Sequence, residues 1–386
     1  MKNINQNERF YLLDIFRGFA AICVVLQHYQ HFYYTKSMNL DDSFKYDQLP
    51  LFEYISFGYK FGSVAVQFFF LLSGFIFFSF YKKKIFKKNI SFKNFLILRI
   101  SRLYPLHILT LFLMLILQKV YYSFSSSYFV YGNNGIENFL LHLFLIQEWG
   151  VANLFNINNS SGYNHPAWSI SVEIFVYISF FITSLIFIKN FIESIVFLII
   201  TIFIYIIIHE FLGNLAVGII LFYLGGSTYY LCNIIKKNLS SKKYLILIGI
   251  LLFDFVIFGR FLNNFFLDFQ STFDYLFGKR LMILLFFIKF PLIIINLDII
   301  QFYFKNLGKK LIILGDLSYT IYLIHVPLQI SIMFINNIVF DIPFNDPFFF
   351  IFYFILIFAI SFFIFKYFEH PCKNIIRKKL IKKIIN

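Results

Sequence analysis

The chain has 386 residues, of which 60% are hydrophobic, 23% are aromatic and only 14% are charged. Its 60 phenylalanines exceed what a water-soluble core of this length can bury, whereas lipid accepts them on the outer faces of helices. The composition therefore excludes a soluble globular protein and indicates one that spans a membrane. The formal charge of +15 does not point to nucleic acid, because the lysines lie in short runs between apolar stretches.

A helix needs about 20 mostly apolar residues to cross a bilayer. The sequence predicts an all-α polytopic membrane protein with about ten transmembrane helices, near residues 11–33, 62–81, 103–122, 167–188, 191–209, 214–233, 244–260, 281–299, 312–335 and 347–367. The first stretch contains Asp14 and Arg17, and no small-residue cleavage site follows it. We therefore expect it to remain as the first helix rather than to be removed as a signal peptide.

Lysine and arginine collect in alternate loops, which predicts the orientation of the chain. The segment 82–102 contains eight of them and no acidic residue, whereas the segment 122–166 contains none. The first is predicted to be cytoplasmic and the second external, with Arg260, Lys279 and Arg280 as exceptions on the predicted outer side. Because ten is an even number, both termini are predicted to be cytoplasmic, in a multi-pass protein of the inner (cytoplasmic) membrane.

The chain is predicted to form a single transmembrane domain, with a core at about 10–372. The basic residues 373–386 are predicted to be a cytoplasmic tail, and no soluble appended domain is expected. Within the external segment, the apolar piece 139–146 is too short to span and is predicted to be re-entrant or interfacial. The three cysteines lie at scattered positions, so neither a disulfide nor a metal site is predicted.

The first helix carries charged and titratable residues where lipid disfavours them. A charged side chain inside a bilayer costs about 3 kcal/mol on insertion scales, so such residues point to a site facing a cavity. Arg17 and His28 are eleven residues apart, which places them on one helix face about 16 Å apart along its axis. Alternatively, Asp14 and Arg17 form an interfacial pair and His28 is an interfacial histidine like His31.

The third helix begins with two arginines that share a face. Arg99 and Arg102 are three residues apart, and two guanidinium groups at that spacing suit phosphates. On the cytoplasmic side they predict a site for a nucleotide-like donor. The alternative is attraction to anionic headgroups of the membrane lipids.

Three further helices contain candidate site residues. Glu173 lies about two turns into its helix, where it acts as a general base, orients a histidine or pairs with an arginine. Tyr322 and His325 continue a polar ridge, although a single histidine of this kind is more often a packing residue, so we rank His325 below His28 as a catalyst. Ser73 precedes a glycine, which favours close helix packing over a serine nucleophile.

Six short motifs occur in a fixed order between about residues 10 and 372. They are Phe16-Arg17 with His28, Phe69 to Phe75 (FFLLSGF), Arg99-x-x-Arg102 followed by Leu-Tyr-Pro, Trp168-Ser-x-Ser-x-Glu173, Ser318-Tyr-x-x-Tyr322-Leu-x-His325 and Glu369-x-Pro371. Through these motifs taken together, the chain resembles the acyltransferase-3 family of membrane proteins. One departure is His107, where the family often has tyrosine.

The resemblance implies transfer of an acyl group, usually acetyl, from cytoplasmic acyl-CoA to a hydroxyl of a cell-envelope carbohydrate such as O-antigen, capsule or exopolysaccharide. Acetyl-CoA is then a donor substrate, no cofactor is tightly bound, and lipid-linked sugars are among the acceptors. The resemblance assigns Arg17 and His28 to the catalytic region and Arg99 and Arg102 to donor binding. We add Glu173 to the catalytic group, with supporting residues Asp14, Ser73, Trp168, Tyr322 and His325.

Two chemical routes stay open for His28. It acts either as the general base on the sugar hydroxyl or as a transient acceptor of the acyl group. Many relatives carry an extracytoplasmic hydrolase-like domain after the last helix, whereas none is expected here. Transfer is therefore expected to be completed within the membrane domain or with a partner protein. The rival hypotheses are a glycan transporter or flippase, for which internal repeats and broken helices are expected, and a glycan polymerase or ligase. The oligomeric state stays open.

Overall fold

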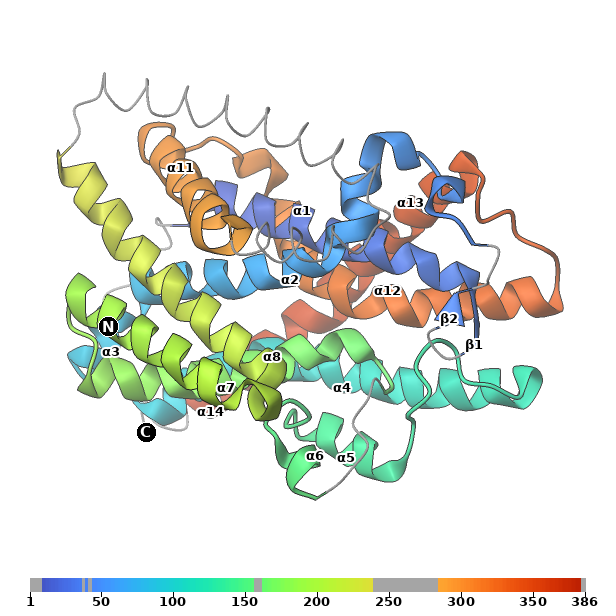
Figure 1. Cartoon of the computed structure of the whole chain (residues 1–386), viewed down its shortest axis with the longest axis horizontal. Coiled ribbons are helices and arrows are strands. Elements are labelled where there is room, and N and C mark those ends of the chain that lie inside the picture. The colour runs from blue at the N-terminus through green and yellow to red at the C-terminus, as the bar shows by residue number, and fades with distance from the viewer. Residues whose placement is uncertain (1–8, 37–38, 41–43, 156–161, 239–283, 383–386) are drawn as a thin grey trace.

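The computed structural model describes residues 9–36, 39–40, 44–155, 162–238 and 284–382 (Figure 1). Helices dominate this part of the chain, and its two strands, β1 (Tyr34–Lys36) and β2 (Asn39–Leu40), form one small antiparallel pair. Eight of the described helices are long and apolar enough to cross a bilayer. The predicted all-α, multi-pass membrane class is therefore confirmed.

The long helices are α1 (Tyr11–His28), α2 (Phe52–Phe80), α4 (Phe92–Ser125), α7 (Trp168–Ile186), α8 (Phe191–Asn238), α11 (Phe290–Tyr303), α12 (Ile312–Ile338) and α13 (Pro347–Ile364). Shorter helices are α3 (Lys82–Phe86), α5 (Ile136–Leu143), α6 (Val151–Leu154) and α14 (His370–Lys382). Single turns of 3-10 or π type are η1 (Tyr29–Tyr33), η2 (Tyr46–Gln48), η3 (His165–Ala167), η4 (Leu285–Lys289), η5 (Lys309–Leu311) and η6 (Phe365–Glu369). The predicted stretches all coincide with helical segments except 244–260, which lies outside the described residues.

Helix α8 folds back on itself and so accounts for two of the predicted stretches. Its Ser194 Oγ lies 2.8 Å from Ser227 Oγ, and the rings of Phe197 and Tyr223 are 4.5 Å apart. In a straight helix, residues 33 positions apart would be separated by about 50 Å. Gly213 has a φ of +42°, which only glycine adopts readily, and lies between the two arms.

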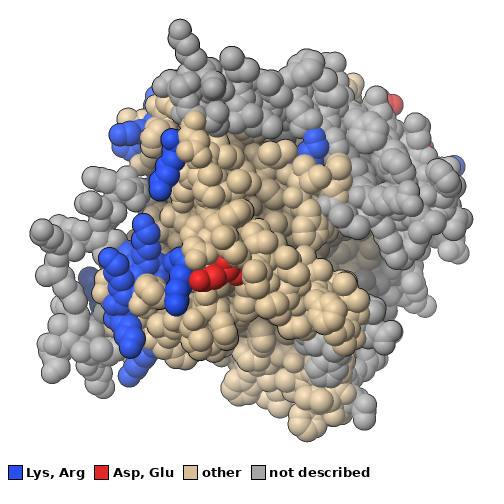
Figure 2. All heavy atoms as spheres, turned by 60° about the vertical axis from the view of Figure 1, so that its left-hand side comes forward, with Lys and Arg blue, Asp and Glu red and all other residues tan. Residues whose placement is uncertain are grey.

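Basic side chains gather at one end of the helices, which we call the basic end. Figure 2 shows lysine and arginine clustered there, and Figure 1 places α3 and α14 at this end. The lysine-rich turns that begin at Lys82 and at Lys309 both lie between helices that meet here. The segment predicted to be a basic tail is largely the helix α14, which packs against the start of α4.

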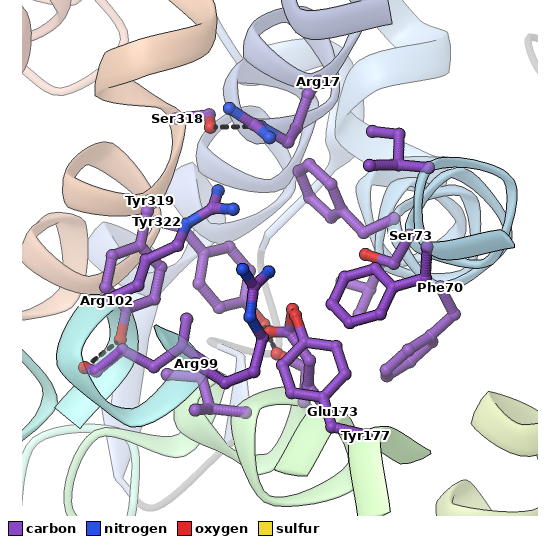
Figure 3. Close-up of a pocket in the computed structure, with 17 residues that line it drawn as sticks. Arg17, Phe70, Ser73, Arg99, Arg102, Glu173, Tyr177, Ser318, Tyr319 and Tyr322 are labelled. Atoms are coloured by element: carbon purple, nitrogen blue, oxygen red, sulfur yellow. Dashed lines mark hydrogen bonds between the residues drawn. The ribbon is translucent and has the colours of Figure 1, made fainter. Parts of the chain in front are cut away.

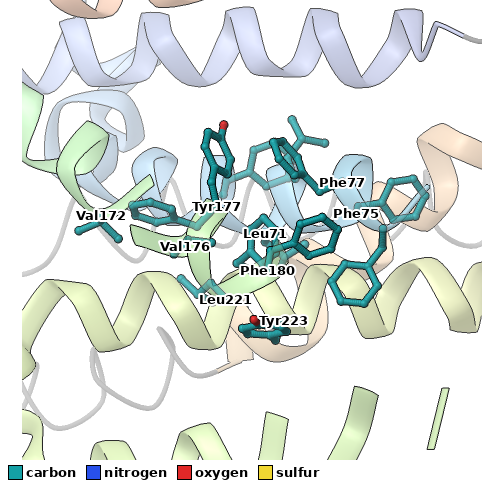
Figure 4. Close-up of a cluster of buried hydrophobic side chains, with 14 of the residues drawn as sticks. Leu71, Phe75, Phe77, Val172, Val176, Tyr177, Phe180, Leu221 and Tyr223 are labelled. Atoms are coloured by element: carbon teal, nitrogen blue, oxygen red, sulfur yellow. The ribbon is translucent and has the colours of Figure 1, made fainter. Parts of the chain in front are cut away.

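A core of aromatic side chains joins α2, α7 and α8 (Figure 4). The rings of Phe77 and Tyr177 stack with centroids 4.5 Å apart and planes 14° from parallel. Phe180 and Tyr223 extend this core toward α8, and both are fully buried. Because Phe77 and Tyr177 also border a cavity described below, the core fixes one wall of that cavity.

Helices α2 and α8 approach closely at Gly74, as the Ser-Gly pair predicts. A Cβ atom at Gly74 would lie 1.8 Å from the carbonyl oxygen of Phe222, and one at Gly225 would lie 1.9 Å from that of Leu71. Both obstacles are backbone atoms, which no change of rotamer can move. Glycine is therefore required at this crossing.

Gly74→Val is expected to lower the free energy of unfolding by about 2 kcal/mol or more, because overpacking against backbone forces the helices apart. Thermal unfolding of the detergent-solubilised protein measures this loss. Gly135→Val is a matched control, since the nearest atom to a Cβ there is 4.0 Å away. Equal melting temperatures for the two variants would contradict the close crossing.

The segment that the sequence predicts to be external turns back alongside α4. Tyr104 donates to the carbonyl of Leu143 at 2.9 Å, and His107 Nε2 donates to the carbonyl of His142 at 2.8 Å. Both donors lie in the middle third of α4, so the turn after α5 reaches that level. These contacts favour the re-entrant form of the two predicted arrangements.

Candidate active site

Two adjoining cavities lie among α1, α2, α4, α7 and α12. The first is the inner cavity (Figure 3), and the second is the vestibule, which lies toward the basic end. The residues that line both are Arg17, Ile76, Arg99, Arg102 and Tyr319. Three guanidinium groups therefore surround the passage between the two cavities.

Arg17 is held in place by α12. Its Nε donates to Ser318 Oγ at 3.0 Å and its Nη2 donates to the carbonyl of Gly315 at 2.7 Å. Asp14 lies 3.3 Å from the same guanidinium group, so the predicted pair between positions 14 and 17 is present. Arg17 nevertheless lines both cavities, so the ion pair and the cavity-facing position occur together.

Arg99 lies in a cage of aromatic rings. Its guanidinium carbon is 4.7 Å from the ring centre of Tyr81 and 5.0 Å from that of Phe77, and its Nη2 donates to the Tyr81 hydroxyl at 2.6 Å. The side chain is buried, and its Nε has no hydrogen-bond partner among the described residues. Stacking holds this planar group in one orientation while leaving a donor unused.

Arg102 is the least engaged of the three arginines. It lines both cavities and forms no hydrogen bond or direct ion pair with any residue that the structure describes. Glu173 and Glu369 attract it electrostatically across the cavities. An unpaired, half-buried guanidinium group is suited to bind an anionic ligand.

Glu173 lies on the α7 wall of the inner cavity, where it accepts a hydrogen bond from the Tyr177 hydroxyl. It attracts Arg102 electrostatically without forming a direct ion pair with it, and no described contact joins it to His28. Ser73 also lines the cavity. Trp168 does not; it packs on Phe70, which is a lining residue, at a ring distance of 6.1 Å.

Tyr322 lines the inner cavity one turn before His325 on α12. Its hydroxyl donates to the carbonyl of Pro166 at 2.6 Å and lies 2.8 Å from Ser169 Oγ. The ring of Phe69 lies 6.2 Å away on the other side. We call Tyr322, Ser169 and Phe69 the tyrosine wall, and the ring of His325 lies 6.2 Å beyond Tyr322.

His28 and His325 form a direct pair beyond the tyrosine wall. His28 Nδ1 lies 2.6 Å from His325 Nε2, and His325 Nδ1 lies 3.3 Å from the carbonyl oxygen of Ile321. A carbonyl only accepts, so His325 carries its proton on Nδ1 and accepts from His28 through Nε2. His28 therefore carries its proton on Nδ1, which leaves a lone pair on its Nε2.

Gln329 fixes the histidine pair from the next turn of α12. Its Nε2 donates to the carbonyl of His28 at 2.7 Å, and its Oε1 accepts from His31 Nδ1 at 3.0 Å. The His31 ring stacks on the His28 ring at 4.7 Å. In the described part of the chain, no three or more histidine, cysteine or acidic side chains form a group that could hold a metal ion.

The structure thus separates the predicted site residues into three places. Arg17, Arg99, Arg102, Glu173, Ser73 and Tyr322 line the inner cavity, His28 and His325 lie beyond the tyrosine wall, and Asp14 lines the vestibule. Sequence reasoning did not select several lining residues, namely Arg9, Tyr177, Tyr319, Lys373 and Arg377. For the last two a signal exists, because Glu369, Lys373 and Arg377 recur every four residues and so share one helix face.

The spanning helices, with polar side chains gathered in cavities between them, define a multi-pass membrane protein with a buried site. The family model described as "Acyltransferase domain" matches residues 10–366, and the chain belongs to this family of acyltransferases. Protein 2 in the picA locus of Rhizobium radiobacter is 36% identical over 107 residues, which are 28% of this chain and 44% of that protein. The match thus spans less than half of that relative. No solved structure matches the chain.

Proposed function

We propose that the protein transfers an acyl group, in the first place acetyl, from acyl-CoA to a hydroxyl of a cell-envelope carbohydrate. The observation that carries this proposal is the arrangement of three arginines around the passage from the vestibule to the inner cavity. Beyond that cavity lies a histidine pair with a free ring nitrogen. Phosphate-binding groups and a base thus lie in succession along one path.

The charge distribution supports entry of the donor from the basic end. Lysine and arginine collect on the cytoplasmic side of membrane proteins, and CoA thioesters are cytoplasmic. Arg99 and Arg102 would hold phosphate of the donor at the passage, with Arg17 as a third cation. The pantetheine arm then extends through the inner cavity, whose apolar lining includes Phe69 and Val66. We propose on the same grounds that the protein lies in the inner membrane.

The tautomer of His28 supports its role in the transfer. In the direct route, Nε2 takes the proton of the acceptor hydroxyl as its oxygen bonds to the thioester carbon, and the C–S bond then breaks. The proton finally passes to the departing thiolate. In the covalent route, Nε2 bonds to the acyl carbon as the C–S bond breaks and the thiolate leaves. The sugar oxygen then bonds to the same carbon as the C–N bond breaks, and the hydroxyl proton passes to the thiolate. Both routes need the same free nitrogen and an open tyrosine wall.

The proposal is tested with membranes that contain the wild type or His28→Ala, incubated with radiolabelled acetyl-CoA and envelope glycans of the host. Alkali-labile label in the glycan is expected with the wild type and is expected to fall to background with the variant. Correct insertion of both proteins is verified first. If the wild type transferred no label from acetyl-, succinyl- or longer acyl-CoA, the proposal would be wrong and glycan transport would be tested next.

A further inference from the structure

The C-terminal helix α14 contributes two cations to the vestibule. Lys373 and Arg377 lie one turn apart on the helix face that begins with Glu369, and all three line the vestibule. Lys378 and Lys379 follow directly in the sequence but are exposed and do not line it. The helix thus separates cations that face the cavity from cations that face outward.

Arg377 attaches α14 to the turn of α4 that carries Arg99 and Arg102. Its Nε donates to Ser101 Oγ at 3.0 Å, and its Nη2 donates to the carbonyl of Leu98 at 3.0 Å. Neither partner is an anion, so no described residue neutralises the positive charge of Arg377 through a direct ion pair. The attachment fixes α14 beside the passage between the cavities.

Lys373 is half-buried and forms no hydrogen bond or direct ion pair with a described residue. Arg102 and Arg377 repel it, while Glu369 and Asp316 attract it from a distance. Glu369 is itself engaged by Thr320, whose hydroxyl donates to it at 2.6 Å. Three neighbouring cations with so few direct counter-charges are suited to an anionic ligand, which would offset their mutual repulsion.

We propose that Lys373 and Arg377 form a second phosphate subsite, which takes a phosphate group separate from the one at Arg99 and Arg102. This inference rests on the proposed function, because a CoA donor carries phosphate in two places. Its diphosphate lies nearer the thioester, and its ribose 3′-phosphate lies farther away. With the thioester in the inner cavity, the diphosphate lies at the passage and the 3′-phosphate reaches α14.

The test compares acetyl-CoA with acetyl-3′-dephospho-CoA as donors for the full-length protein. Charge-assisted hydrogen bonds contribute about 1.5–3 kcal/mol, so wild-type kcat/KM is expected to be roughly 10-fold to 100-fold lower with the dephospho donor. In the Lys373→Gln/Arg377→Gln double variant this ratio is expected to approach one.

The matched control is Lys378→Gln/Lys379→Gln, which removes the same charge from outward positions of the same helix and should keep the wild-type ratio. If loss of Arg377 detaches α14, Lys373→Gln alone is used instead, because Lys373 makes no direct polar contact within the described part of the chain. A wild-type ratio near one, or an unchanged ratio in the Lys373→Gln variant, would overturn the second subsite while leaving acyl transfer established. Absence of transfer from both donors would instead remove the proposed function and the subsite with it.

Discussion

Replacing His28 with alanine is expected to lower the rate of acyl transfer by about 10²-fold to 10⁴-fold, the contribution of a positioned general base. The same change removes the acceptor nitrogen of the covalent route, so both routes predict the loss. Transfer of labelled acetyl to glycan is the measurement. His370→Ala removes an exposed histidine from α14 and is the control expected to keep full activity.

His325 provides the sharper part of this prediction, because it acts through His28. His325→Leu removes the acceptor of the His28 Nδ1 proton and is expected to lower kcat roughly 10-fold to 100-fold, the loss found when the orienting partner of a metal-bound histidine is removed. His325→Gln offers an amide oxygen in its place and should recover much of the rate. It should also restore the wild-type pH profile. A glutamine variant as inactive as the leucine variant, although equally stable, would show that the pair does not set the tautomer.

Replacing Arg102 with alanine is expected to raise the KM for acetyl-CoA by about 10-fold to 100-fold, with a smaller effect on kcat. Arg102 has no direct partner in the described structure, so its loss leaves no other group unpaired and should not affect folding. Arg102→Lys keeps a positive charge without the planar fork and should recover part of the affinity. The measurement is initial rate against donor concentration.

Arg99 provides a contrast to Arg102 in the same experiment. Because its guanidinium group packs on Tyr81 and Phe77, Arg99→Ala is expected to lower the melting temperature as well as the affinity for the donor. If Arg102→Ala left the KM unchanged and lowered only kcat, the donor-binding role of Arg102 would be wrong. A loss of melting temperature in Arg102→Ala would indicate a structural role instead.

Hydropathy predicted where the helices lie but not where they begin. Helix α2 begins at Phe52 and α4 at Phe92, each about ten residues before the apolar stretch that predicted it. Backbone hydrogen bonds can extend a helix beyond the bilayer into polar sequence. Hydropathy detects only the apolar part of the helix that suits lipid. For α4 the start is set by Ser91, whose hydroxyl accepts from the amide of Asn94 at 3.2 Å.

The composition of the site was partly predictable, but its connections were not. The misplaced charges of α1, α4 and α7 identified Arg17, Arg102 and Glu173, all of which line the inner cavity. Spacing within one helix says nothing of which atoms meet across two helices, so the His28–His325 pair appears only in three dimensions. The face formed by Lys373 and Arg377 was missed because basic residues after the last apolar stretch are typical of a solvated tail.

The tyrosine wall bears on how such an enzyme avoids hydrolysing its donor. A donor thioester bound in the inner cavity, as we propose, would be separated from the histidine pair while Tyr322 stays bonded to Pro166 and Ser169. Water that enters from the histidine side meets the same barrier as the acceptor. The binding energy of a sugar ring can offset the loss of these two hydrogen bonds and open the wall, whereas a single water molecule supplies little binding energy. The wall would then favour transfer over loss of the acyl group to solvent.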